Sequence, residues 1–327
     1  MTVGFQLVSL THPVKQKSTT PLKCQGALAW ASHVFFDRNV SVNNFIDPTA
    51  EESASPTEAL HPWRRFVAIG DSFTEGIGDP DPQSPGGNRG WADRVAEQLS
   101  QNVEGFAYAN LAIRGRLINQ IFDEQAAPAL ELKPDLISLC AGGNDVIRPG
   151  GDPDAIADKL DALVRVLATS GATILLFNGP DIRDTPVLGG IRGKVAIYNE
   201  NVRTIAARYD AVVADMWSLQ ELHQPQMWAE DRLHFSPLGH HTIAAMALDS
   251  LNVPHNLKHV PASEIDAKNW REARRDDLIW ARAHLAPWVL RRLRHQSSGD
   301  GITAKRPLAT PFTEKPINTS LGHGPAV

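Results

Sequence analysis

The sequence has few cysteines and no long apolar run, and each scarcity excludes a class of protein. Its two cysteines, Cys24 and Cys140 among 327 residues, are too few for a disulfide framework or for a zinc site built from cysteine. No apolar stretch approaches the roughly 20 residues that a membrane-spanning helix needs. The most apolar N-terminal stretch, residues 26–36, contains a histidine and runs directly into Asp37 and Arg38 without a small-residue cleavage site. We therefore expect no membrane span and a cytoplasmic location.

The chain also lacks an excess of positive charge. Its formal net charge is −5, so nucleic acid is not expected as a partner. The content of 42% hydrophobic and 21% charged residues is typical of an ordinary globular protein. At this length the chain can bury a large core in one or two domains.

Short β-rich runs alternate with helical patterns through the middle of the chain. The predicted strands are residues 66–70, 106–111, 136–140, 174–178 and 211–215. The predicted helices are residues 91–99, 117–127, 156–167, 194–209 and 238–251. This alternation predicts a parallel sheet with helices on both faces, in which ligands bind at the carboxyl ends of the strands.

The two ends of the chain differ from this central pattern. We expect a poorly ordered arm over residues 1–62, one α/β domain over 63–257, a helical extension over 258–295 and a disordered tail over 296–327. The extension is rich in Arg and Trp, but acidic residues are interspersed with its arginines. A solvated helix face is therefore favoured over an adaptor for anionic surfaces, although the adaptor stays open.

Ser72 lies in the stretch AIGDSFTEG, directly after the first predicted strand. Locally, Ser72 and Glu75 fit a capping box, in which the serine caps a helix and the glutamate reaches back. The position is equally suitable for a nucleophile at the carboxyl end of a strand. A nucleophile needs a base, an orienting acid and donors for an oxyanion elsewhere in the chain.

The stretch DRLHFSPLGH supplies a candidate base and acid. Asp231 and His234 are three residues apart, close enough for the carboxylate to fix one imidazole nitrogen and leave the other as base. The alternative is that Asp231 caps a turn and His234 lies at the surface. A metal site using the nearby His240 and His241 is a weaker alternative, because adjacent histidines on a helix point in different directions.

Two further loops follow predicted strands and contain possible oxyanion donors. The stretch AGGND brings Asn144, whose neutral amide has two hydrogens to donate, and the stretch NLAIRG brings the backbone amide of Gly115. Each stretch by itself is also an ordinary turn sequence.

In their order along the chain, GDSFTEG, the glycine of NLAIRG, GGND and DRLHFSPLGH resemble the four sequence blocks of the SGNH (GDSL) hydrolases. The resemblance covers roughly residues 65–251. It implies a flavodoxin-like three-layer α/β/α sandwich with a five-stranded parallel sheet. It also implies Ser72 as nucleophile, His234 as base, Asp231 as orienting acid, and Ser72, Gly115 and Asn144 as oxyanion donors, with no metal or organic cofactor.

The function expected from these residues is that of a serine esterase acting on small-molecule esters through an acyl-enzyme. Small or medium acyl groups are favoured, and the oligomeric state is left open. The rival hypotheses are a non-catalytic binding protein with the same fold, and the adaptor that uses the Arg-rich extension.

Overall fold

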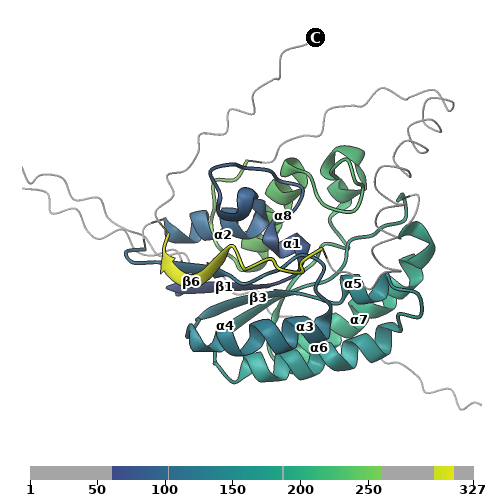
Figure 1. Ribbon diagram of the computed structural model, residues 1–327, viewed down its shortest axis with the longest axis horizontal. Coiled ribbons are helices and arrows are strands. Elements are labelled where there is room, and N and C mark those ends of the chain that lie inside the picture. The colour runs from purple at the N-terminus through teal and green to yellow at the C-terminus, as the bar shows by residue number, and fades with distance from the viewer. Residues whose placement is uncertain (1–60, 102, 186–187, 259–297, 313–327) are drawn as a thin grey trace, which may run out of the picture. The chain divides into compact units, whose positions relative to one another are not determined.

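A computed structural model describes residues 61–101, 103–185, 188–258 and 298–312 (Figure 1). All of them lie in the second of the two units into which the chain divides, residues 54–327. Of the expected arm, residues 1–62, only His61 and Pro62 are described, and of the expected helical extension, residues 258–295, only Lys258 is described. The rest of both predictions lies outside the described residues and stays untested.

The described part of the chain is built on a six-stranded sheet. Its strands are β1 (Arg65–Gly70), β2 (Ala107–Asn110), β3 (Leu136–Cys140), β4 (Thr173–Phe177), β5 (Val212–Ala214) and β6 (Arg306–Pro311). Their order across the sheet is β5-β4-β3-β1-β2-β6. The first five strands pair in parallel, and β6 pairs antiparallel to β2. The prediction of a parallel sheet from five runs is confirmed, and each run agrees with its strand to within about one residue at either end.

Helices cover both faces of the sheet, as Figure 1 shows. The longer ones are α2 (Gly90–Ser100), α6 (Pro153–Ala168), α7 (Arg192–Arg208) and α8 (Pro237–Ser250). The short ones are α1 (Ser72–Glu75), α3 (Ile118–Ile121), α4 (Ala127–Glu131) and α5 (Gly143–Val146). Single turns of 3-10 helix occupy Pro85–Gly87, Leu188–Ile191, Gln220–His223 and Pro225–Met227.

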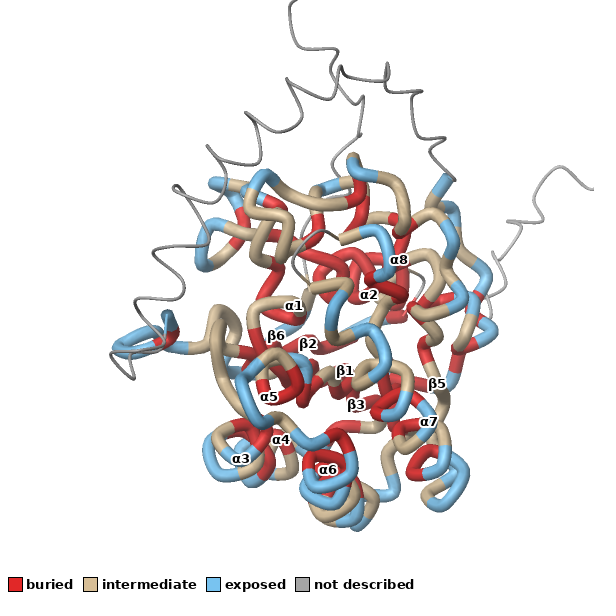
Figure 2. The backbone as a smooth tube through the Cα atoms, turned by 90° about the vertical axis from the view of Figure 1, so that its right-hand side faces the viewer, coloured by how far each residue is buried: buried red, intermediate tan, exposed pale blue. Residues whose placement is uncertain are grey.

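Two apolar cores separate the sheet from its helices. One core joins the sheet to α2 and α8, and includes the fully buried Trp91 and Leu99. The other joins the opposite face to α3, α4, α6 and α7, and includes Leu163 and Leu167 of the predicted stripe on α6. In Figure 2 the buried residues follow the strands and the inward faces of these helices. The three-layer α/β/α architecture is thus confirmed.

The helix predicted over residues 117–127 is interrupted and longer than expected. A π-helical turn, Phe122–Ala126, lies between α3 and α4, and the helical stretch ends at Glu131. π-turns of this kind are frequent near functional sites because the extra residue re-aims side chains. Here the turn carries Glu124 and Gln125, which both face the loops described below.

The prediction of a disordered tail from residue 296 is wrong for residues 298–312. This segment supplies β6, whose two prolines are tolerated because it is an edge strand. The boundary of the expected arm also shifts slightly, since His61 is buried, contacts the Leu99 carbonyl at 2.8 Å and stacks on Trp63.

The topology fixes where a site can form. The chain leaves β1 toward the β2 edge of the sheet and later continues from β3 toward the β5 edge, so a switch point lies between β1 and β3. In open α/β sheets the crevice at such a point is the preferred place for ligands. The loops that follow β1 and β3 carry Ser72 and Asn144. Within the described residues, no helix is both long and apolar enough to cross a membrane.

Candidate active site

Ser72 is the first residue of α1, directly after β1 and the intervening Asp71. The cap of this helix is Asp71, whose side chain accepts a hydrogen bond from the amide of Phe73 at 3.1 Å. The capping-box prediction for Ser72 and Glu75 is therefore wrong. A carboxylate one residue earlier takes the capping role, which leaves the Ser72 hydroxyl available for another partner.

That partner is His234. The distance from Ser72 Oγ to His234 Nε2 is 3.0 Å, and the distance from His234 Nδ1 to Asp231 Oδ2 is 2.5 Å. A carboxylate can only accept, so Nδ1 carries a hydrogen; in the neutral ring Nε2 is then an acceptor for the serine hydroxyl. The structure thus brings the three sequence-predicted residues into one hydrogen-bonded series.

Asp231 also shapes the turn that presents His234. Its Oδ1 accepts from the amides of Leu233 and His234, both at 3.0 Å. The turn-capping role considered from sequence is therefore present together with the contact to the imidazole. His234 is not a surface residue, because only 19% of its side chain is exposed.

The surroundings of Asp231 favour its charged form. Burial by itself raises the pKa of this carboxyl, but the hydrogen bond and the charge of His234, together with the two backbone amides, outweigh burial. The net result is a pKa far below the ordinary value. A permanently ionised Asp231 holds the imidazole in one tautomer.

An aromatic cluster connects the segment of Ser72 to that of His234. Phe73 packs against Phe235 with ring centroids 5.6 Å apart, and also against Trp91 and Phe177. The loop after α1 approaches the same segment so closely that a Cβ on Gly78 would lie 2.1 Å from the Phe235 carbonyl oxygen. Packing between neighbours of Ser72 and His234 thus fixes the distance between the two side chains.

Asn144 lies in α5, after β3, and its side-chain amide joins two loops. Nδ2 donates to Asp71 Oδ2 at 2.9 Å and to the Arg116 carbonyl at 3.2 Å. The second bond places Asn144 beside the loop after β2 that contains Gly115. That loop approaches the segment before Ser72, since the Ile113 amide donates to the Gly70 carbonyl at 3.3 Å.

Asp71 is a member of this site that sequence reasoning missed. Burial raises the pKa of its carboxyl to about 6. The hydrogen bond from the Phe73 amide, the charge of His234 and the hydrogen bond from Asn144 each lower the pKa, but burial outweighs them. Asp71 directly precedes Ser72 in the GDS stretch, so the sequence already shows that the two residues are neighbours. The contact with Asn144 was not visible there, because it joins two loops far apart in sequence.

Two further contacts around the loops also escaped sequence reasoning. Gln125, from the π-turn, exchanges two hydrogen bonds with the backbone of Gly70 at 2.8 and 2.9 Å. Glu75 accepts from the amide of Arg114 at 2.7 Å and forms an ion pair with the guanidinium of the same residue. The first contact joins the end of β1 to the π-turn, and the second joins α1 to the loop after β2.

The adjacent histidines of α8 have separate structural contacts. His240 is fully buried; its Nδ1 accepts from the Trp91 amide at 3.2 Å and its Nε2 lies 3.1 Å from the Ile77 carbonyl. Burial lowers its pKa to about 4. The Nε2 of His241 lies 2.8 Å from the carbonyl of Lys258. In the described part of the chain, no group of three or more His, Cys, Asp or Glu side chains is arranged to hold a metal ion.

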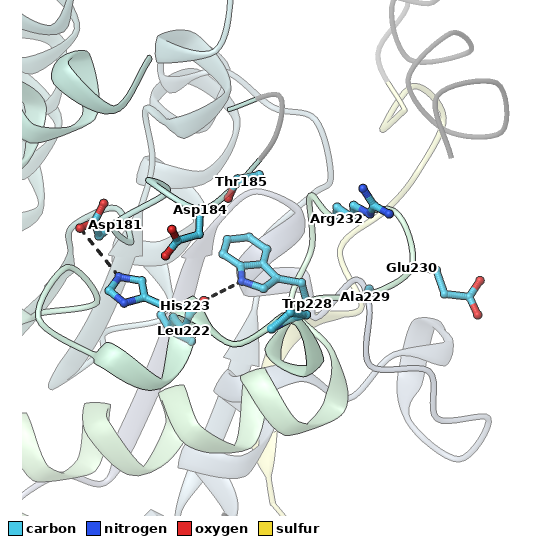
Figure 3. Close-up of a pocket in the computed structure, with 10 residues that line it drawn as sticks. Asp181, Asp184, Thr185, Leu222, His223, Trp228, Ala229, Glu230 and Arg232 are labelled. Atoms are coloured by element: carbon cyan, nitrogen blue, oxygen red, sulfur yellow. Dashed lines mark hydrogen bonds and ion pairs between the residues drawn. The ribbon is translucent and has the colours of Figure 1, made fainter. Parts of the chain in front are cut away.

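A pocket of about 550 Å³ lies beside Ala229, Glu230 and Arg232 (Figure 3), which shortly precede His234 in the chain. Three loops form its walls. The residues that line it are Asp181, Asp184, Thr185, Leu222, His223, Pro225, Trp228, Ala229, Glu230 and Arg232. The Trp228 indole donates to the Leu222 carbonyl at 2.7 Å and packs on Phe235 with centroids 4.5 Å apart. Because Ala229 also donates to the His234 carbonyl at 2.8 Å, the wall of the pocket and the imidazole belong to one folded loop.

Two solved structures are similar in fold: a catalytic mutant of an acetylxylan esterase from Geobacillus stearothermophilus and an alpha/beta hydrolase enzyme from the metagenome of Lake Arreo, Spain. The first is 23% identical with a TM-score of 0.50, and the second is 22% identical with a TM-score of 0.49. Each match covers 58% of this chain and 95% of the other.

A curated relative from Bacillus subtilis (strain 168), the uncharacterized protein YpmR, is 28% identical over 89 residues. The match covers 25% of this chain and 32% of that protein, so the chain spans about a third of the relative's length. The model of the GDSL-like lipase/acylhydrolase family matches residues 68–242, which include all five sequence-predicted site positions. The chain belongs to the GDSL-like lipase/acylhydrolase family.

Proposed function

We propose that the protein is a serine esterase that cleaves carboxylic esters of small molecules through an acyl-enzyme on Ser72. The observation that carries this proposal is the hydrogen-bonded series from Ser72 through His234 to Asp231. A serine hydroxyl is a weak nucleophile alone, and a neutral imidazole held by a carboxylate is the group that activates it.

In the first half of the reaction, Ser72 Oγ attacks the ester carbonyl carbon as its proton passes to His234 Nε2. The new C–O bond makes a tetrahedral oxyanion. When the bond to the alcohol oxygen breaks, the same Nε2 returns the proton to the leaving alcohol. Asp231 stays ionised throughout and stabilises the imidazolium.

In the second half, water attacks the acyl-enzyme while His234 takes one of its protons. Collapse of the second tetrahedral intermediate breaks the bond to Ser72 Oγ, which regains a proton from His234, and the carboxylic acid leaves. The cycle balances without any further reactant.

The oxyanion donors in this proposal are the amides of Ser72 and Gly115 and the side chain of Asn144. Asn144 Nδ2 already donates to Asp71 and to the Arg116 carbonyl. An oxyanion would compete for the hydrogen of the longer bond, the one to Arg116. Loss of one such donor typically reduces the rate by about 10²–10³-fold.

The preference for small or medium acyl groups stays a prediction. The pocket of about 550 Å³ is in the size range of small-molecule sites, roughly 300–1,000 Å³, but neither Ser72 nor His234 lines it. The acetylxylan esterase in the comparison is under 25% identical and shares the fold alone, so it assigns no substrate here. A cytoplasmic location and the lack of nucleic-acid binding stay predictions.

The decisive test is an ester panel of varied acyl length and alcohol, run on the wild-type protein and on Ser72→Ala. We expect Ser72→Ala to lower kcat/KM by at least about 10³-fold, whereas Ser218→Ala, an exposed serine outside the site, leaves it unchanged. A serine-directed phosphonate should label wild type at Ser72. Normal turnover in folded Ser72→Ala would overturn the proposal and favour the non-catalytic alternative.

The variant Asp231→Asn tests the role of the orienting acid independently of the role of the nucleophile. It should reduce kcat by roughly 10²–10⁴-fold, because an amide can stabilise the wrong tautomer and no longer offsets the imidazolium charge. Measurement of kcat and of Ser72 phosphonylation rates should show the same loss in both. Unchanged rates in this variant would contradict the assigned role of Asp231.

A further inference from the structure

The C-terminal segment, residues 298–312, lies outside the family match but packs against the loop that contains Gly115. Asp300 lies 3.5 Å from the guanidinium of Arg116, and Gly299 is buried against Arg114. Farther along, Lys305 Nζ donates to the carbonyls of Asn88 and Arg89 at 3.1 and 2.7 Å. The segment then pairs with β2 as β6. It is therefore attached at several points to the strand and loop that lead to Gly115.

Gly299 contacts the peptide unit that joins Arg114 to Gly115. A Cβ on Gly299 would lie 2.2 Å from the Arg114 carbonyl oxygen and 2.8 Å from Ile113 Cγ2. Only a residue without a side chain fits at this distance. The carbonyl oxygen of Arg114 and the amide hydrogen of Gly115 belong to the same planar unit and point in opposite directions. If the carbonyl oxygen of Arg114 is displaced, the N–H of Gly115 therefore rotates with it and points in a different direction.

The residues on either side of this peptide are held firmly. Arg114 is bound through its amide and guanidinium to Glu75 of α1. Arg116 forms an ion pair with Glu124 at 2.8 Å, and its carbonyl accepts from Asn144. With both flanks fixed, we expect added bulk at Gly299 to be relieved by rotation of the peptide between Arg114 and Gly115, because the carbonyl oxygen of Arg114 is the nearest atom to it.

We propose that Gly299 is a positioning residue that sets the direction of the Gly115 amide toward the reacting carbonyl. The inference rests on the proposed function, because it gives the Gly115 amide its role as oxyanion donor. It adds that residues beyond the family match complete the geometry of the oxyanion site, with Gly299 in contact with the peptide and Asp300 restraining its Arg116 flank.

The test compares Gly299→Ala with Gly301→Ala in the full-length protein. Gly299 has no positive φ, so alanine there is opposed by the contacts with Arg114 and Ile113 and not by backbone strain, whereas Gly301 has a φ of +75° and open space around it. Both replacements disturb the same turn, but only the first touches the 114–115 peptide. We expect Gly299→Ala to lower kcat by roughly 10- to 100-fold with KM within about twofold. Gly301→Ala should lower the melting temperature without changing kcat.

A spectroscopic readout separates this inference from the proposed function. With ¹⁵N-glycine labelling, Gly299→Ala should shift the amide resonance of Gly115, and Gly301→Ala should not. If Ser72→Ala stays active, the proposed function fails whatever Gly299 does. If wild type is a serine esterase but Gly299→Ala keeps the kcat of Gly301→Ala, the inference is overturned.

Asp300→Ala provides a second variant should Gly299→Ala not fold. It removes one restraint on Arg116 from an exposed position, 62% accessible, and is expected to fold. A several-fold fall in kcat at constant KM supports the inference. An unchanged kcat in folded Asp300→Ala would then overturn it.

Discussion

Around Ser72, single side chains combine structural contacts with their proposed chemical roles. Asp71 caps α1 and accepts a hydrogen bond from Asn144, while Asp231 forms a turn and orients His234. Ser72 itself has no capping contact, since the capping hydrogen bond belongs to Asp71. We therefore expect replacement of Ser72 to cost little stability, and replacement of Asp71 to cost more.

The first prediction compares these two adjacent residues. Ser72→Ala should change the free energy of unfolding by less than about 0.5 kcal/mol. Asp71→Ala removes the cap and should lower it by about 1 kcal/mol. Urea unfolding of the two variants and wild type measures both values. A loss in Ser72→Ala as large as that in Asp71→Ala would contradict the assignment of the cap.

The second prediction concerns pH. The pKa of Asp71 is raised to about 6 from an ordinary value of 3.8, so between these values the folded protein binds a proton that the unfolded chain releases. The contribution of Asp71 to stability is therefore highest in acid and falls as pH rises from about 4 to 6, by about 3 kcal/mol in total. The difference in unfolding free energy between wild type and Asp71→Asn should follow this fall. Parallel pH curves for the two proteins would contradict it.

At the scale of elements, the loop before α8 holds His234 in place. It folds back on itself through bonds from Ala229 to the His234 carbonyl and from Ser236 to the Met227 carbonyl, at 2.8 and 2.9 Å. Ser236 then caps α8, accepting from the Gly239 amide at 3.2 Å, and its hydroxyl donates to the Gln226 carbonyl at 2.5 Å. One residue thus ends the loop and begins the helix.

The third prediction tests this junction. Ser236→Ala should lower the free energy of unfolding by roughly 1–2 kcal/mol, because both the cap and the bond to Gln226 are lost. Ser250→Ala is the matched control at the other end of α8, where the hydroxyl bonds back to the carbonyl and the sulfur of Met246, one turn earlier, and should have little effect. Thermal and urea unfolding of both variants supply the comparison. Equal stability of the two would show that the cap contributes nothing.

At the scale of the molecule, a buried ion pair attaches the C-terminal segment to the domain. Lys305 Nζ lies 3.0 Å from Asp93 of α2, and their side chains are 2% and 0% exposed. Asp93 also accepts from the hydroxyl of Tyr108 in β2 at 2.8 Å. Removal of Lys305 leaves the buried Asp93 with only the more distant guanidinium of Arg306, 3.7 Å away, as a counter-ion, and loss of the nearer partner of a buried pair is strongly destabilising. Residues 298–312 therefore belong to the fold and are not an appendage.

The fourth prediction follows from this pair. Lys305→Met should lower the free energy of unfolding by about 3 kcal/mol or more. Lys159→Met, on the exposed face of α6, should stay within about 0.5 kcal/mol. Chemical denaturation of both variants provides the measurement. Similar values for the two lysines would mean that the segment is not held by its contact with Asp93.

The length of the chain needed for activity follows as a fifth prediction. Because β6 is part of the sheet, a chain that ends at residue 312 should keep the stability and ester hydrolysis of the full-length protein. A chain that ends at residue 297 loses β6, Lys305 and Gly299, and should be both less stable and less active. Melting temperature and kcat of the two truncations measure this. Full activity after truncation at 297 would contradict it.

The sequence by itself determined the five parallel strands, the two helical layers and the place of Ser72, Gly115, Asn144, Asp231 and His234 at the carboxyl ends of strands. These features follow from local patterns. Apolar periodicity distinguishes strand from helix, and a parallel sheet directs the loops after its strands to one edge.

Only the tertiary structure decided the cap of α1, the role of β6 and the contacts of Gly299. Asp71 and Ser72 are both good capping residues, and only the structure shows that Asp71 takes the cap while the Ser72 hydroxyl contacts His234, far along the chain. The Arg306–Pro311 stretch has two prolines and little apolar character, so local propensity predicted disorder. It forms a strand because the edge of β2 and the buried Asp93 offer partners that no local pattern reveals.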